Sequence, residues 1–240
     1  MQGVVPAAGE GTRLRPHTAE MPKGLVEIRG QPLLAHCFDP LLDLGVEELV
    51  VIIGYRGEQI VERFGEQYRG VPVSYAVQEE PVGLADAVVR AEPHVDGDFV
   101  LMNGDNLFDA DLRPLIDRHS EADAEATLLV DEVTTDEAAS TGVLRFDDDG
   151  ELSGVVEKPV DPPSTRVSRG CYAFSPLIFH ACHLVQPTDR GEYELSDAVD
   201  LLLGAGRTVG TVPFDGRCIN VNTPEDLERA EALLETGGDP

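Results

Sequence analysis

The side chains best suited to chemistry lie within the first two dozen positions, where an apolar run ends in a glycine-rich turn. Gly9 and Gly11 follow the apolar residues 4–8, and the basic residues Arg13 and Lys23 come next. Glycine lets a backbone turn sharply and approach a ligand closely, and successive N–H groups in such a loop form a cradle for anions. Arginine binds phosphate oxygens through its planar fork, and lysine adds a point charge. The loop therefore predicts a binding site for a polyphosphate.

Two familiar phosphate-binding loops do not fit this stretch. A Walker loop requires Gly-x-x-x-x-Gly-Lys followed by Ser or Thr, and no such run occurs. The dinucleotide fingerprint requires a third glycine at the position of Leu14. What remains is the longer string Ala-Ala-Gly-x-Gly-Thr-Arg-Leu-x-Pro-x-Thr over residues 7–18, followed by Pro-Lys at residues 22–23. A string of this length is rare by chance, whereas a single Gly-x-Gly after a strand is most often only a turn.

The composition indicates an acidic chain with a sizeable core. The chain has 240 residues, of which 42% are hydrophobic, and a formal net charge of -27 that is spread along the sequence. This charge argues against nucleic acid or an anionic membrane as a partner. It suits a cytosol of molar salt, where ions screen self-repulsion, and it predicts that stability rises with KCl. Lys23 and Lys158 are the two lysines among 18 lysine and arginine residues, and both fall inside motifs.

Several features that the sequence lacks indicate the cellular compartment that we expect. No run of 18 apolar residues occurs, so we expect no membrane span, and the N-terminus lacks the basic and apolar regions of a signal peptide. The cysteines are scattered without a C-x-x-C spacing, which suits free thiols in a reducing cytoplasm. We interpret the His180-x-Cys182-His183 segment as packing, because this spacing does not converge on one zinc ion. The four cysteines are Cys37, Cys171, Cys182 and Cys218.

Hydrophobic periodicity predicts alternating strands and helices in the first half. The expected strands are residues 3–7, 25–28, 48–53, 71–77 and 98–102. The expected helices are residues 32–44, 57–68 and 84–91. Such alternation implies right-handed βαβ units. The expected fold class is therefore α/β, a Rossmann-like mixed and mostly parallel sheet flanked by helices.

The pattern changes after residue 110, where strands follow one another more closely. The expected strands are residues 127–133, 142–146, 152–157, 172–174 and 208–213. The expected helices are residues 113–119, 176–182, 194–203 and 224–234, the last of which Thr223 is placed to cap. No internal repeat or clean linker separates the halves. We therefore expect residues 1–240 to form a single domain, with the second half as an insertion and lid on the same sheet.

Two further segments end expected strands, at the edge where open α/β sheets bind ligands. Gln78 offers both a donor and an acceptor, which suits the edge of a nucleobase, and Gly83 allows close approach. The alternative is an ordinary turn between a strand and a helix. Asp105, beside Gly104, is suited to Mg²⁺, which prefers oxygen ligands, although aspartate is also common in turns.

Together these strings resemble the sugar-1-phosphate nucleotidyltransferases, also called sugar-nucleotide pyrophosphorylases. The match runs from Val4 to Leu227 and is closest to the short glucose-1-phosphate thymidylyl- and uridylyltransferases. Within these the chain most resembles the archaeal UTP–glucose-1-phosphate uridylyltransferases that serve protein glycosylation. The resemblance implies a nucleotide-binding half, residues 1–110, and a sugar-phosphate-binding half, residues 111–240. The implied nucleotide contacts are Ala8, Gly9, Gly11, Thr12, Arg13, Gln78 and Gly83. The implied sugar-phosphate contacts are Gly142, Glu157, Lys158, Tyr172 and Arg190, with Gly170 also lining the sugar pocket.

The resemblance also implies a metal site, and here the sequence departs from the family. Asp105 matches the family's metal-binding aspartate, but Asn220 stands where a second aspartate is usual and Cys218 where tryptophan is usual. An amide oxygen can still bind Mg²⁺, with a lower affinity expected. Asn222 lies two residues further on, so the sequence leaves open which asparagine binds the ion, or whether either is only a turn residue. Pro6 also departs from the usual leucine, in a strand where a missing N–H is normally costly.

The implied reaction joins a nucleoside triphosphate, UTP or dTTP, to a sugar-1-phosphate, with Mg²⁺ as cofactor. An oxygen of the sugar phosphate attacks the α-phosphorus in line and pyrophosphate leaves, with Arg13 and Lys23 as catalytic residues. The alternative is a regulatory homologue that binds these ligands without turnover, which Asn220 and Cys218 favour. The sequence does not decide which base or which sugar is used. It also leaves the oligomeric state open, with a homo-oligomer as one alternative.

Overall fold

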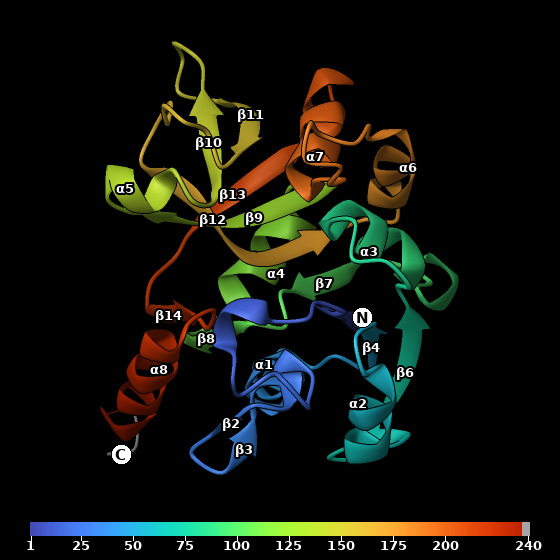
Figure 1. Cartoon of the computed structure of the whole chain (residues 1–240). Coiled ribbons are helices and arrows are strands. Elements are labelled where there is room, and N and C mark those ends of the chain that lie inside the picture. The colour runs from blue at the N-terminus through green and yellow to red at the C-terminus, as the bar shows by residue number, and fades with distance from the viewer. Residues whose placement is uncertain (237–240) are drawn as a thin grey trace.

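The structure is a computed structural model that describes residues 1–236, and a ten-stranded mixed sheet runs through it (Figure 1). The strand order is β11-β10-β12-β7-β1-β4-β6-β5, with β9 paired to β12 and β13 paired to β9. Its strands are β1 (Gln2–Ala7), β4 (Glu48–Ile53), β5 (Gln67–Tyr68), β6 (Val71–Val77), β7 (Phe99–Met102), β9 (Ala126–Glu132), β10 (Gly142–Phe146), β11 (Leu152–Glu157), β12 (Arg166–Phe174) and β13 (Val209–Pro213).

The centre of the sheet is parallel, as the alternation of strands and helices predicts. Strands β7, β1, β4 and β6 pair in parallel, with Val4 opposite Val50 on one side and Leu101 on the other. Strand β12 is antiparallel to both β7 and β9. Because β4 and β7 are covered on both faces, they are nearly continuous apolar runs. The expected fold class, a mixed α/β sheet, is confirmed.

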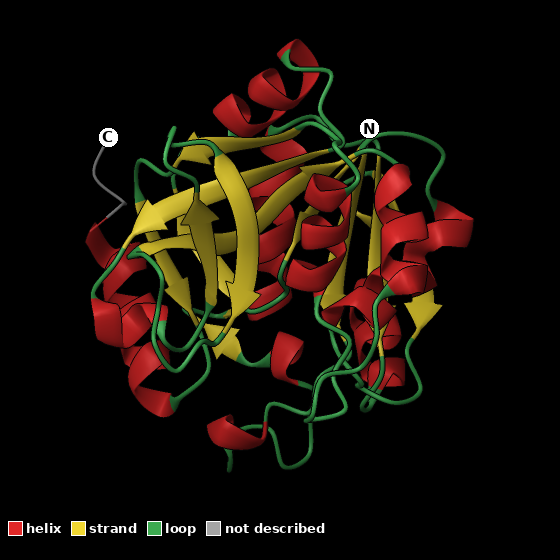
Figure 2. Ribbon diagram, turned by 90° about the horizontal axis from the view of Figure 1, so that it is seen from above, coloured by secondary structure: helices red, strands yellow, loops and turns green. Residues whose placement is uncertain are grey.

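Helices cover both faces of the sheet, and Figure 2 shows the strands running between them. Helices α3, α6 and α7 pack on one face, and α1, α2 and α4 on the other. The bounds are α1 (Leu33–Asp43), α2 (Gly57–Phe64), α3 (Leu84–Ala91), α4 (Arg113–Glu121), α5 (Thr135–Ala138), α6 (Leu177–Leu184), α7 (Leu195–Gly204) and α8 (Pro224–Thr236). No helix within residues 1–236 has the length and apolar character needed to cross a membrane.

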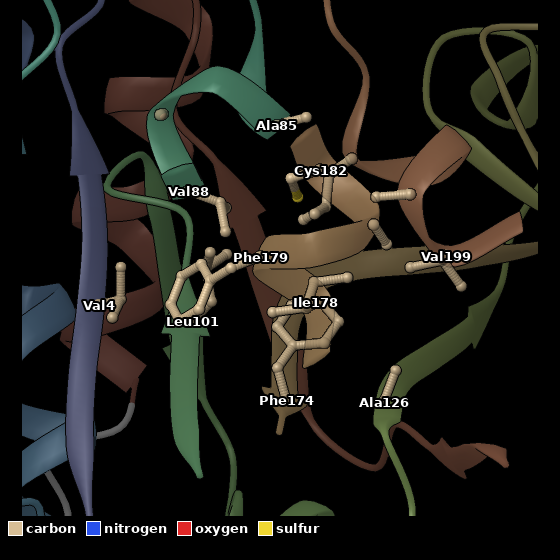
Figure 3. Packing of buried hydrophobic residues seen from close by; sticks show 14 of the residues in the cluster. Val4, Ala85, Val88, Leu101, Ala126, Phe174, Ile178, Phe179, Cys182 and Val199 are labelled. Atoms are coloured by element: carbon tan, nitrogen blue, oxygen red, sulfur yellow. The ribbon is translucent and has the colours of Figure 1, made fainter. Parts of the chain in front are cut away.

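The larger core cluster fills the space between the sheet and the α3, α6 and α7 layer (Figure 3). The rings of Phe99 and Phe179 stack at 5.2 Å, and Phe174 packs beside Phe99. Full burial of a side chain of this size stabilises the fold by about 1.5–3 kcal/mol. Cys182 is buried in this cluster, as we expect for packing, whereas the neighbouring His180 and His183 are exposed.

A two-stranded ladder joins the middle of the chain to its C-terminal region. Strand β8 (Asn106–Asp109) pairs antiparallel with β14 (Arg217–Asn220), so that Asn106 lies opposite Asn220. Helix α8 packs beside this ladder in a third apolar cluster (Figure 1). The buried members of that cluster are Leu14, Ile28, Leu33, Leu107, Ile219, Val221, Ala230 and Leu233. The glycine-rich loop and the last helix therefore share one small core.

Some predicted boundaries are wrong. The helix expected over residues 57–68 ends at Phe64, because Gly65 leaves the helical region at φ 63°. Residues 67–68 instead form β5 and turn back onto β6 through Arg69 and Gly70, both with positive φ. Residue 25 lies in a 3-10 turn, η2 (Lys23–Leu25), and not in a strand. Strand β12 begins at Arg166, six positions before the expected start, and the β8–β14 ladder was not predicted.

Pro6 is accommodated in β1 because of where its backbone points. Within a strand, the N–H and C=O of one residue point to the same neighbour. The Pro6 carbonyl accepts a hydrogen bond from the Gly104 N–H at 3.1 Å, so both groups point to the β7 side. Pairing with β7 stops at Val4, before the position of Pro6. The ladder with β7 therefore ends before the position at which a Pro6 N–H would donate.

Candidate active site

The glycine-rich loop follows β1 and ends in a 3-10 turn, η1 (Thr12–Leu14). Gly11 has φ 64° and ψ 38°, and a Cβ built on it would lie 2.8 Å from the Cβ of Lys23. Only glycine fits both that conformation and that space. The Thr18 hydroxyl donates a hydrogen bond to the Gly11 carbonyl at 2.7 Å. The loop is thus folded back against the segment that carries Lys23.

Five predicted residues from three distant segments meet beside this loop. The Lys23 ammonium lies 2.8 Å from Asp105 Oδ2 and 2.9 Å from Asn222 Oδ1. Arg13 Nη2 donates to the same Asn222 oxygen at 2.8 Å. The Asn222 side-chain amide in turn donates to Asn220 Oδ1. We call Arg13, Lys23, Asp105, Asn220 and Asn222 the basic–amide cluster.

The β8–β14 ladder positions the asparagines of this cluster. The Val221 N–H donates to the Asp105 carbonyl at 2.8 Å, which extends the ladder by one residue. Beyond it, Thr223 and Asp226 cap helix α8 reciprocally: each side chain accepts a hydrogen bond from the other's backbone N–H. Asp226 also accepts from the Asn222 N–H at 3.1 Å. The expected cap at Thr223 is therefore present, and it fixes the backbone of Asn222.

The donor set in this cluster suits a hard divalent cation. It offers one carboxylate, Asp105, and the amide oxygens of Asn220 and Asn222, and Mg²⁺ is typically held by one or two carboxylates together with substrate phosphates. Within residues 1–236, no group of three or more His, Cys, Asp or Glu side chains is arranged to hold a metal ion by itself. The residues fit Mg²⁺ delivered with a phosphate ligand.

The expected sugar-phosphate residues line a cavity on the other side of Asp105. Strands β10 and β11 place Gly142 opposite Glu157, and a Cβ on Gly142 would lie 3.1 Å from Glu157 Oε2. Lys158 Nζ lies 3.1 Å from Glu157 Oε1. The Tyr172 ring stacks on Phe174 at 5.4 Å, so it presents a fixed aromatic wall. Gly142, Glu157, Lys158 and Tyr172 all line this cavity.

Two adjoining cavities contain most of the predicted site. The larger, of about 720 Å³, takes in Lys158, and the smaller, of about 360 Å³, takes in Lys23 and the glycine-rich loop. Arg13 and Asp105 line both cavities. The residues common to both are Arg13, Leu84, Asn103, Asp105 and Asn222. A ligand in each cavity would therefore meet at the basic–amide cluster.

Three predicted residues do not line these cavities. Ala8 is buried under the loop. Gln78 is 4% exposed, and its amide nitrogen donates to the Gly83 carbonyl and to Asp86. Arg190 is held at the rim by Glu194, 3.0 Å away, and by Glu192. Gln78 would have to exchange its partners to contact a ligand.

A backbone contact that the sequence does not reveal joins the two halves of the site. The Tyr193 N–H donates to the Val82 carbonyl at 2.7 Å, and the Ala85 N–H donates to the Tyr193 carbonyl at 2.9 Å. Gly83, at φ 122°, lies between these bonds. No pattern of residue types signals a pairing of this kind, because it uses backbone groups alone.

Three polar residues of the larger cavity were also missed as site residues: Glu194, Asn103 and Asn106. Glu194 is buried, and burial together with the negative charge of Glu157 raises its pKa. Asn103 and Asn106 each keep a buried side-chain oxygen without a partner among the described residues. Gly170, at φ 67°, packs against both amides, because a Cβ there would lie 2.4 Å from the Asn106 amide nitrogen. The position of Asn103 and Asn106 just after strand β7 was the feature of the sequence that could have indicated them.

Comparisons with known proteins agree with this geometry. The family model described as nucleotidyl transferase matches residues 2–237. The chain is 52% identical, over 235 residues, to the UTP–glucose-1-phosphate uridylyltransferase AglF of Haloferax volcanii, and the match covers 98% of this chain and 97% of that protein. It is 34% identical to a glucose-1-phosphate thymidylyltransferase of Streptomyces griseus, covering 98% of this chain and 67% of the relative.

The fold is also found among solved structures. A crystal structure of a UDP-glucose pyrophosphorylase complexed with UDP-glucose superposes with a TM-score of 0.88 at 23% identity. The match covers 98% of each chain. At this level of identity the likeness concerns the fold, and it extends over both halves of the sheet.

Proposed function

The chain belongs to the nucleotidyl transferase family, and we propose that it transfers a nucleotidyl group from UTP or dTTP to a sugar-1-phosphate. The products are a nucleoside diphosphate sugar and pyrophosphate. Glucose-1-phosphate is the expected acceptor, in line with the names of the Haloferax and Streptomyces relatives. The chain is therefore proposed as an enzyme of sugar-nucleotide synthesis.

One observation carries the proposal: the basic–amide cluster lies where two cavities meet. Lys23 and Asp105 are 82 positions apart in sequence and 2.8 Å apart in space, and Arg13 contacts Asn222 across 209 positions. Two phosphorylated ligands repel each other, so their reaction needs fixed positive groups at the point of contact. A cluster with this composition supplies them.

The chemistry requires positioning and charge neutralisation more than a covalent catalyst. An oxygen of the sugar phosphate forms a bond to the α-phosphorus while the bond from the α-phosphorus to the β-phosphate oxygen breaks. The nucleophile is already anionic, so no general base is needed. We assign Lys23 to the α-phosphate and Arg13 to the departing pyrophosphate. Mg²⁺ held by Asp105 and an asparagine oxygen would supply further neutralisation.

The substrates would occupy the two cavities. The loop residues Gly9, Gly11 and Thr12 border the smaller one, as suits a triphosphate. Glu157 can accept hydrogen bonds from sugar hydroxyls, and Lys158 can meet the phosphate of the sugar. Residues 1–110 would then hold the nucleotide and residues 111–240 the sugar phosphate. A cytoplasmic location is part of the proposal, supported by the four free cysteines.

The test is a substrate panel in molar KCl. Four nucleoside triphosphates are combined with several sugar-1-phosphates and Mg²⁺, and pyrophosphate release is measured. We expect release with UTP or dTTP and glucose-1-phosphate. Ligand binding measured by calorimetry without any pyrophosphate release would instead identify a regulatory homologue, the alternative that Asn220 and Cys218 favour.

A further inference from the structure

Lys23 lies between two of the oxygens that are suited to the metal ion. Its ammonium is 2.8 Å from Asp105 Oδ2 and 2.9 Å from Asn222 Oδ1. A Mg²⁺ ion shared by these oxygens would lie about 2.0–2.1 Å from each. An ammonium at hydrogen-bond distance from both oxygens and an ion bound to both cannot be accommodated together. Lys23 and the ion therefore compete for one position.

The competition is reinforced by Arg13. The Asn222 side-chain oxygen has two lone pairs, and it accepts hydrogen bonds from both Lys23 and Arg13, at 2.9 and 2.8 Å. Asn222 therefore has no lone pair left for an ion while both donors are in place. The ammonium is also largely shielded from water, since the Lys23 side chain is 13% exposed. Its charge repels a second cation strongly in such surroundings.

A triphosphate changes this balance. Phosphate oxygens carry more charge than an amide oxygen, so they attract Lys23 and Arg13 away from Asn222 and Asp105. Both basic side chains border the smaller cavity, together with the glycine-rich loop. When they move to the phosphates, Asp105 Oδ2 and Asn222 Oδ1 are released to an ion that the same phosphates help to hold.

We propose that Lys23 occupies the metal position of the enzyme until a triphosphate removes it, so that the ion and the nucleotide bind as one unit. The proposal rests on the function given above, and it names the metal–triphosphate complex as the binding species. Lys23 is then a group that exchanges partners, Asp105 before binding and phosphate afterwards. This exchange keeps a divalent ion from being trapped at Asp105 alone.

The first experiment measures Mn²⁺ binding without nucleotide, by the paramagnetic resonance signal of the free ion. The whole chain is used in molar KCl, because salt suppresses weak ion binding to a surface of net charge -27. The variants are Lys23→Met, Arg13→Met and the double variant Lys23→Met with Asp105→Asn. Arg13→Met is the matched control, since it removes a positive charge that contacts Asn222 but not Asp105.

We expect Lys23→Met to bind one Mn²⁺ at least about tenfold more tightly than the parent chain. Arg13→Met should show a much smaller gain, and the double variant should lose the gain. An equal gain in Arg13→Met would show that the loss of any nearby positive charge improves Mn²⁺ binding, and it would overturn the proposal. No gain in Lys23→Met, or a gain that survives Asp105→Asn, would overturn it as well.

A second measurement uses the parent chain, so its result does not depend on whether a variant of the site folds. Lys23 and Lys158 are the two lysines, so ¹³C-labelled lysine gives side-chain resonances from two residues. We expect the Lys23 resonance to be unchanged by millimolar-range Mg²⁺ alone and to shift when Mg²⁺ and a non-hydrolysable UTP analogue are added together. A shift with Mg²⁺ alone would contradict the proposal.

These outcomes are separable from those of the proposed function. Pyrophosphate release by the parent chain tests the reaction, and Mn²⁺ binding without nucleotide tests the exchange. A chain that releases pyrophosphate but whose Lys23→Met variant binds Mn²⁺ no better would retain the function and lose this inference. A chain without turnover could still show the exchange.

Discussion

The backbone of Tyr193 lies directly against Gly83. A Cβ built on Gly83 would stand 2.3 Å from the Tyr193 carbonyl oxygen, and the flanking residues are joined to Tyr193 by two hydrogen bonds. Gly83 begins the helix that follows Gln78, and Tyr193 belongs to the segment that carries Arg190. The segment expected to read the base is therefore fixed to the segment expected to bind the sugar phosphate.

Substitution of Gly83 should break this connection. In Gly83→Ala the new Cβ meets the Tyr193 backbone, and φ 122° is unfavourable for alanine, so we expect destabilisation by more than about 1 kcal/mol. Urea unfolding measures it. Gly97→Ala is the matched control, because a Cβ there meets nothing within 4 Å and should cost little. Equal stability of the two variants would contradict the packing described here.

Loss of the Arg13 guanidinium should reduce turnover. Arg13 is the proposed contact to the departing pyrophosphate, and removal of one transition-state donor typically costs about 10²–10³-fold in kcat. Pyrophosphate release at saturating substrates measures the effect of Arg13→Ala. Arg15→Ala is the control, since Arg15 is exposed and pairs only loosely with Glu10 at 3.7 Å. Near-normal kcat in Arg13→Ala would remove Arg13 from the mechanism.

The two asparagines can be separated by restoring a carboxylate at each in turn. We expect Asn220→Asp or Asn222→Asp to lower the Mg²⁺ concentration that gives half-maximal activity, because a carboxylate binds Mg²⁺ more tightly than an amide. The variant with the larger decrease identifies the ligand. Asp105→Ala should raise the requirement in either background. If neither variant lowers the requirement, the asparagines serve only the hydrogen bonds described above.

Salt should stabilise the chain. A net charge of -27 produces self-repulsion in the folded state, and molar KCl shortens the screening length to about 3 Å. We expect the thermal unfolding midpoint to rise steadily from low salt to molar KCl. A midpoint that is independent of KCl would show that the acidic side chains do not limit stability.

His119 should make stability depend on pH. Burial lowers the pKa of His119, and its ring contacts the Thr127 hydroxyl at 3.1 Å, with Asp98 3.8 Å away on the other side. The folded chain therefore keeps the imidazole neutral at pH values where the unfolded chain binds a proton. The His119 contribution to stability is complete above the unfolded pKa of about 6.5 and is lost as pH falls below it.

The measurement compares the parent chain with His119→Gln. Glutamine can still reach Thr127 but does not titrate, so the difference in the free energy of unfolding isolates His119 from the many carboxylates. We expect the parent chain to lose stability relative to the variant as pH is lowered from about 7.5 to about 5. A constant difference over that range would mean that His119 has the same pKa in both states.

Periodicity and turn chemistry predicted most of the framework, since β4, β6, β10, β11 and α3 have the expected bounds. The failures have local causes that tertiary contacts decide. Residues 67–68 continue the helical pattern of α2, but a turn at Arg69 and Gly70 pairs them with β6. Strands β8 and β14 are four residues each and pair only with one another, so neither segment alone shows a strand pattern.

The candidate site was predicted as a set of residue types and not as a set of contacts. Motif spacing named Arg13, Lys23, Asp105 and Asn222, and all four meet. Spacing could not indicate that Lys23 binds Asp105 or that Gln78 turns its amide towards Asp86, because these choices depend on which neighbour offers an acceptor. Their roles in binding and catalysis stay predictions until the variants above are measured.

The ladder between β8 and β14 also has a consequence for how the protein is made. The glycine-rich loop and Asp105 are synthesised early, but Asn220 and Asn222 reach them only through strand β14. The buried side chains of α8 then complete the small core around Leu14. A nascent chain still attached to the ribosome before these residues emerge lacks one wall of its phosphate site. The phosphate site is thus completed only after β14 and α8 have been synthesised.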